Sequence, residues 1–127
     1  MKKQSLWISV VFISSLLLSA CAVGQDLSAV SKLGNDFMTG LRDGQYQQTW
    51  AMLTSALQTE IGGYDAWVTF ATPRTFDKWS FSNTQIQNNQ GQLDGECSIG
   101  TDTYTITLVM DKVGTDWKIS GINITAK

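Results

Sequence analysis

Few side chains in this sequence could carry out catalytic or metal chemistry. The 127 residues include no histidine, so the commonest catalytic base and the commonest metal ligand are both missing. The eleven acidic residues lack the spacing of a calcium-binding loop, and there is no glycine-rich phosphate-binding loop. Two cysteines, Cys21 and Cys97, and five tryptophans are the remaining residues with distinctive chemistry. We therefore expect no metal and no cofactor.

The charge balance argues against a nucleic-acid partner. Nine basic and eleven acidic residues give a net charge of −2. Proteins that bind the phosphate backbone need a basic face, and no basic stripe is present in this sequence. We therefore expect no nucleic acid among the partners.

The first 21 residues contain the most specific motif of the chain. Lys2 and Lys3 precede an uncharged, mostly apolar run, Leu6–Leu18. Its 13 residues match the core of a signal peptide and fall short of the roughly 20 that span a membrane. The following Leu18-Ser19-Ala20-Cys21 resembles the lipobox of bacterial lipoproteins. The resemblance implies that residues 1–20 are a signal peptide and that Cys21 becomes the lipid-modified (palmitate-bearing) N-terminus. An ordinary secretory leader is the alternative.

Such a lipid would hold the rest of the chain at a membrane of the bacterial cell envelope. One acyl chain binds only marginally, whereas two or three bind durably, because each buried methylene contributes about 0.8 kcal/mol. In lipoproteins an aspartate after the modified cysteine is associated with inner-membrane retention. Ala22 in that position implies the periplasmic face of the outer membrane in a Gram-negative host. Residues 21–26 are only a short tether, because four extended residues span at most about 14 Å.

Cys97 would be the one thiol left once Cys21 is lipidated. It lies in an alternating apolar and polar run, which predicts a small, buried hydrophobic side chain. The alternative is an intermolecular disulfide in an oxidising compartment.

The rest of the chain divides into a helical half and a strand-rich half. A first helix is predicted to begin at the N-cap Asp26 and to end before Gly44. A second helical run contains Tyr46, and a third covers residues 57–70, loosened or broken by Gly62-Gly63; Pro73 ends this half. Spacings of three and four define the buried stripe of the first helix: Leu27, Val30, Leu33, Phe37, Met38 and Leu41.

Beyond Pro73, apolar and polar residues alternate as in half-buried strands. Turn-rich segments at residues 88–91, 100–102 and 114–116 separate four strands, which predicts an antiparallel meander. In the last strand the apolar phase changes between Ile119 and Ile122. Gly121 lies at that change and is the expected site of a bulge or sharp bend.

Helices followed by a curved antiparallel sheet predict an α+β domain with the helices on one face. The run Phe37–Trp50 resembles the opening of NTF2-like (cystatin-like) domains, with an amphipathic helix, an Asp-Gly-x-Tyr turn and a second helix. The run Asp116–Ile122 resembles their last strand. The resemblance spans residues 27–124 and implies an NTF2-like cone over residues 27–127. In such a cone the N-terminal helices pack on a curved four-stranded antiparallel sheet, with space for a pocket between them.

Six side chains are candidates for lining such a pocket. Tryptophan and tyrosine favour binding surfaces, but most of these aromatic residues also lie on the phases assigned to the core, where packing explains them. Asn83 continues the inward phase of Trp79 and could orient a ligand. Alternatively, the strand leaves the core at Asn83, and Ile86 becomes the next inward-facing residue. The six candidates are Trp50, Tyr64, Trp67, Trp79, Asn83 and Tyr104.

The sequence leads to two functional hypotheses. The first is a lipid-anchored envelope protein whose non-catalytic domain binds a small apolar ligand or an envelope protein near the membrane. The alternative is an isomerase or hydro-lyase with an Asp/Tyr pair in the cone, as in family members that resemble ketosteroid isomerase. No local motif assigns a catalytic residue. An enzyme should place an aspartate of raised pKa in an aromatic cavity, and a ligand binder should have an open apolar cavity. A docking module should have a filled cone and an exposed apolar patch outside it.

Overall fold

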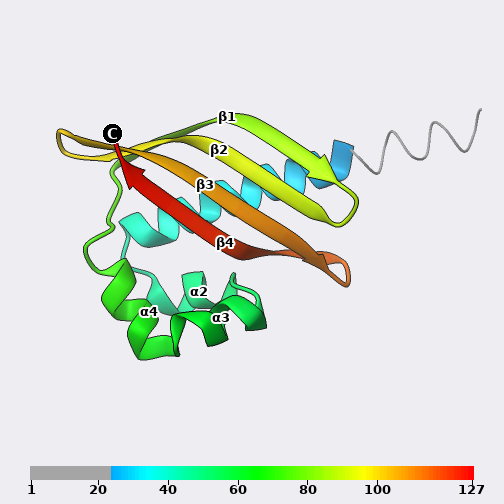
Figure 1. The fold of residues 1–127 in the computed structure, drawn as a ribbon, viewed down its shortest axis with the longest axis horizontal. Helices are drawn as coiled ribbons and strands as arrows, with labels where there is room; N and C mark the ends of the chain where they lie inside the picture. Colours follow the sequence, from blue (N-terminus) through cyan, green and yellow to red (C-terminus); the bar gives the residue numbers. More distant parts are fainter. Residues whose placement is uncertain (1–23) are drawn as a thin grey trace, which may run out of the picture.

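The computed structural model describes residues 24–127. The proposed signal peptide, the lipobox and Cys21 lie outside the described residues. Within this range a helical N-terminal part is followed by a curved antiparallel sheet (Figure 1). This is the α+β architecture predicted from the sequence.

A long N-terminal helix covers residues 24–42 and runs along one face of the sheet (Figure 1). Its predicted stripe is confirmed at Val30, Phe37, Met38 and Leu41, all fully buried. Leu27 is an exception, because its side chain is 38% exposed. Leu27 lies one turn before Val30, near the N-terminal end of the described helix.

The expected N-cap role of Asp26 is wrong. Residues 24 and 25 are already helical, so Asp26 lies within the helix and does not precede it. Its carboxylate instead accepts hydrogen bonds from Lys112 and Trp117, which belong to the last two strands. These partners lie far along the sequence, which is why local capping rules did not anticipate them.

Three short helices follow: α2 (Tyr46–Ala51), α3 (Ser55–Ile61) and α4 (Tyr64–Ala71). The predicted break inside the third helical run is confirmed at Gly62 and Gly63, whose φ angles are 105° and 114°. Residues with a side chain rarely adopt such angles, so the two glycines let the chain turn sharply between α3 and α4. Helix α4 ends at Ala71, two residues before Pro73, as expected.

The sheet is an antiparallel meander with the strand order β1-β2-β3-β4, as predicted. Its N-terminal helix and strands pack closely. A Cβ built on Gly34 of the helix would lie 2.2 Å from Leu93 Cδ1, so a side chain there would have to displace Leu93. The strands are β1 (Lys78–Gln87), β2 (Gln90–Ile99), β3 (Asp102–Val113) and β4 (Asp116–Ala126).

Two bulges change which side chains face the helices. In β1, Phe81 pairs with Gly95 and Asn83 with Asp94, so Ser82 is the extra residue. In β4, Gly121 pairs with Val109 and Ile119 with Met110, which leaves Ser120 as the extra residue. The second bulge directly precedes Gly121, as the change of apolar phase predicted. An extra residue moves every later side chain to the other face of the sheet.

Candidate functional site

The space between the sheet and the helices is filled by side chains. Phe37 and Trp67 are fully buried, and their ring centroids lie 5.9 Å apart. The indole N–H of Trp67 donates to Thr49 Oγ1 at 3.0 Å, so its polar group is satisfied inside the protein. Trp67 is therefore part of the core, as the packing alternative predicted. The other large side chains that are fully buried in the described residues are Phe76, Met38, Leu41, Leu53, Leu93, Ile106, Leu108, Met110, Ile119 and Val30.

Trp50 and Tyr64 are the two candidates that lie together. Their rings meet edge to face with centroids 6.0 Å apart and join α2 to α4. Both side chains are half-buried. Tyr64 also lines an open hollow of about 330 Å³ with residues 44–48. This pair packs two short helices against each other.

Trp79 joins the sheet to the N-terminal helix. Its indole N–H donates to Asn35 Oδ1 at 2.9 Å, and the Arg42 guanidinium lies 5.6 Å from the ring centroid. The half-buried ring also borders a small open hollow of about 220 Å³ on β1 and β2. These contacts account for the aromatic residue without a ligand.

Asn83 and Tyr104 complete the set. The bulge at Ser82 turns Asn83 outward, where it is exposed, and places Thr84 and Ile86 toward the core. The alternative in which Ile86 takes over is therefore confirmed. Tyr104 packs edge to face on Phe76, with centroids 5.7 Å apart. The six candidates thus belong to separate contacts and do not converge on one cavity.

The interior holds no carboxylate suited to proton transfer. Among residues 24–127, the buried polar or charged side chains are Thr49 and Thr54. Hydrogen bonds from Lys112 and Trp117 hold the pKa of Asp26 below its usual value, and those from Arg42 do the same to the pKa of Asp43. An isomerase of the kind considered above needs the opposite shift in an apolar cavity. In this described range no group of three or more acidic or cysteine side chains is placed to hold a metal ion.

Cys97 is a buried core residue, as predicted. Its side chain is 3% exposed on β2, and burial raises the pKa of its thiol to about 11. The thiolate is the nucleophile in disulfide exchange, so both access and ionisation disfavour this reaction. The intermolecular disulfide has no structural support.

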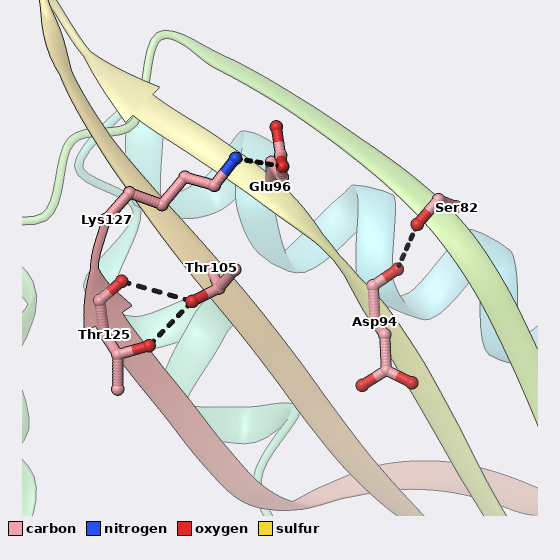
Figure 2. A network of polar contacts seen from close by, with 6 residues as sticks. All are labelled: Ser82, Asp94, Glu96, Thr105, Thr125 and Lys127. Carbon is pink, nitrogen blue, oxygen red and sulfur yellow. Dashed lines mark hydrogen bonds and ion pairs between the residues drawn. The ribbon is translucent and has the colours of Figure 1, made fainter.

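Sequence reasoning predicted a polar outer face of the sheet but missed the hydrogen-bond network on it. The Asp94 carboxylate accepts hydrogen bonds from Asn83 at 3.3 Å, Gln92 at 3.1 Å and Thr107 at 2.8 Å, which joins three strands. Figure 2 shows neighbouring contacts, including Thr105 with Thr125 at 2.7 Å and the ion pair of Glu96 with Lys127. The sequence signal was the polar phase of each strand, which indicated solvent but not a connected network.

A second arrangement that sequence reasoning missed lies where the N-terminal helix meets the hairpins. Asp26 Oδ1 lies 3.1 Å from Lys112 Nζ and 3.2 Å from Trp117 Nε1. The Lys112 backbone N–H donates to the Asn89 carbonyl at 2.8 Å, which links the two hairpins. The partners are up to 91 residues apart, so no local motif could reveal them.

No protein-family model and no curated protein matches the sequence. Solved structures do match the fold. An NTF-2 like protein of unknown function from Silicibacter pomeroyi aligns with a TM-score of 0.65 and 10% identity, covering 83% of this chain and 98% of the other. A Nostoc punctiforme protein of unknown function with a cystatin-like fold aligns with a TM-score of 0.62 and 13% identity, covering 81% and 92%.

A third similar structure is a candidate ketosteroid isomerase from Kribbella flavida, with a TM-score of 0.53, 13% identity and 80% coverage of both chains. Identities this low establish the fold alone. Within the described residues, no helix is both long enough and apolar enough to cross a membrane. Residues 24–127 therefore have the NTF2-like, cystatin-like fold that the two sequence motifs indicated.

Proposed function

We propose that this chain is a lipid-anchored bacterial envelope protein whose NTF2-like domain docks a protein partner near the membrane without catalysing a reaction. The observation that carries the docking role is the filled interior. Trp67, Phe37 and Phe76 occupy the region where a ligand or substrate would have to bind, and each is at most 1% exposed. The lipobox ending at Cys21 supports the anchor.

The outer face of the sheet is the recognition surface that this proposal favours. Polar side chains from all four strands lie there (Figure 2). Hydrogen bonds from Asn83 and Thr107 to the Asp94 carboxylate hold several of them in place. Side chains that are already held lose less conformational entropy when a partner binds. A broad face of hydroxyl, amide and carboxylate groups suits a macromolecular surface better than a small apolar molecule, which needs an apolar cavity.

No observation of this structure favours the binding of a small apolar ligand or an Asp/Tyr enzyme. An apolar ligand would need a cavity among the core aromatic residues, and these residues pack on one another. An Asp/Tyr enzyme would need a carboxylate in the interior, and the described aspartates are at most partly buried. The docking role requires neither feature.

The test is site-specific photo-crosslinking of the full-length protein in cells. Asn123 is exposed on β4 and pairs with Thr107 across the outer face, so a photoreactive residue there samples the proposed surface. Gln47 is exposed on α2 and is the matched control. We expect a discrete protein adduct from position 123 that is absent from position 47.

The same experiment in a Cys21→Ser background tests the anchor. The variant should leave the membrane fraction, because the acyl chains supply the membrane affinity. It should also lose the adduct from position 123 if partner and protein meet at the membrane. Continued membrane fractionation of Cys21→Ser would contradict the anchor, whereas equal adducts from both positions would contradict docking at the outer face.

A further inference from the structure

Three segments that are distant in the sequence meet at one end of the molecule. The start of the N-terminal helix, the β1–β2 turn and the β3–β4 turn lie together at the right of Figure 1, whereas the β2–β3 turn lies at the opposite end. Hydrogen bonds from Lys112 to Asp26 and to Asn89 hold the three segments together. We call residues 26–27, 87–90 and 111–116 the hairpin end.

The exposed apolar side chains of the described chain lie at this end. Leu27 and Val113 are its exposed large hydrophobic residues, at 38% and 52%. Val113 also borders an open groove of about 530 Å³ between the two turns, lined by the amide residues 87–90 and by residues 111–113. Single exposed apolar residues are ordinary on protein surfaces. Here, however, Leu27 and Val113 both lie at the hairpin end, and Val113 borders its amide-lined groove.

The anchor residue lies close to this end along the chain. Gly24, the first described residue, is three positions after Cys21, and three extended residue steps reach at most about 11 Å. A lipid on Cys21 would therefore keep the start of the helix within that distance of the headgroups. The turns bonded to the helix start must then approach the same surface.

The charges at the hairpin end favour a neutral lipid surface. Lys112 is paired with Asp26, while Asp111 and Asp116 add two negative charges. Lys118 is close by, but its ammonium donates to the Ala51 carbonyl of α2. Residues 85–92 of the β1–β2 hairpin carry no charge. A strongly anionic membrane surface would repel this net negative charge, whereas a zwitterionic headgroup layer would not.

We propose that, in the acylated protein, the hairpin end rests on a zwitterionic lipid headgroup layer, with Leu27 and Val113 against the lipid and the amide groove among the headgroups. This inference rests on the lipid anchor of the proposed function. It gives the domain a fixed orientation, because the β2–β3 turn then points away from the membrane. The outer face of the sheet stays open at the side for a partner.

The experiment places a nitroxide label at each end of the full-length acylated protein in phosphatidylcholine vesicles. Val113→Cys carries the label at the hairpin end, and Thr101→Cys carries it in the exposed β2–β3 turn as the matched control. Cys97 is 3% exposed and stays unlabelled, and Cys21 carries the lipid. Collisions with lipid-soluble oxygen and with a water-soluble nickel complex report whether each label faces lipid or water.

We expect several-fold lower nickel accessibility at position 113 than at position 101, with oxygen accessibility raised. A label at Gln87→Cys, on the neighbouring hairpin, should follow position 113. Equal nickel accessibility at positions 113 and 101 in vesicle-bound protein would overturn the fixed orientation and leave the anchor intact. Protein that does not sediment with the vesicles would overturn the anchor and this inference together.

Discussion

Side chains of the same type have different roles in this protein, according to their burial and their hydrogen-bond partners. Trp67 and Trp79 have the same chemistry, but one is enclosed in the core and the other joins a strand to the N-terminal helix. Each indole N–H has a protein partner, Thr49 for Trp67 and Asn35 for Trp79. A buried indole needs such a partner, so these residues specify packing as well as filling space.

At this scale, the pairing of Asp26 predicts a specific pH dependence. Hydrogen bonds from Lys112 and Trp117 depress the pKa of Asp26 below 3.8, so the paired carboxylate stabilises the fold above that pH. Asp26→Asn should lower the free energy of unfolding at about pH 7, and the difference from the parent should shrink as the pH falls below the ordinary aspartate range and through the lowered pKa of folded Asp26. Urea unfolding of both proteins across this range measures it, and a difference independent of pH would contradict the pairing.

A second prediction at the residue scale concerns Cys97. Burial raises the pKa of its thiol to about 11, so little thiolate exists near neutral pH and access is restricted. A water-soluble maleimide should label Cys97 slowly in the folded domain and rapidly in urea. The matched reference is Thr101→Cys, which is exposed in a turn and should react at the rate of a free thiol. Equal folded-state rates at the two positions would show that Cys97 is accessible.

At the scale of elements, the packing of the N-terminal helix on the sheet depends on its close approach to β2. Gly34 makes this approach possible, because a Cβ there would overlap Leu93, which is fully buried. The bulges at Ser82 and Ser120 also belong to this scale, because each exchanges the faces of the residues that follow. They keep Ile86 and Ile122 toward the helices and turn Asn83 and Asn123 to the outside.

The substitution Gly34→Ala tests this helix–sheet contact. Alanine favours the helix intrinsically by about 1 kcal/mol, but overpacking a closed core costs about 1–3 kcal/mol. Gly24→Ala is the control, because it lies on the same helix with nothing within 4 Å of its added Cβ. Relative to this control, Gly34→Ala should lower the free energy of unfolding by about 1–3 kcal/mol. Equal chemical-denaturation midpoints of the two variants would contradict a close-packed interface.

At the scale of the whole molecule, core side chains fill the cone, so the binding surface that we propose lies on its outside. The helices and the sheet contribute large side chains to the same interior, and the rings of Trp67 and Phe70 stack with centroids 5.5 Å apart. A fold that can hold a pocket in one protein can be packed solid in another, because function depends on the side chains that line the site.

The filled cone predicts the outcome of native mass spectrometry. Residues 22–127, exported to the periplasm and purified gently, should give the mass of the bare polypeptide. Spraying the same sample under denaturing conditions is the control. A reproducible excess of mass that denaturation removes would show a bound molecule in the domain and would contradict the filled interior.

Local periodicity, together with breakers such as Gly62-Gly63 and Pro73, was enough to predict the succession of helices and strands. It also indicated the fold through two short motifs, and placed a bulge beside Gly121. The sequence left two positions open for Asn83, since only strand pairing reveals the extra residue at Ser82. Local capping rules likewise could not predict the hydrogen bonds of Asp26, because its partners are 86 and 91 residues away.

Whether the aromatic residues form a pocket or a core depends on how distant segments pack together. An inward-facing tryptophan has the same sequence pattern in both cases, since periodicity reports which face is buried and not what fills the space beside it. The packing of Phe37 on Trp67, and the hydrogen bond of that indole to Thr49, resolve the question in favour of a core. Packing brings together side chains from distant parts of the chain, and so only the folded chain shows which space remains empty.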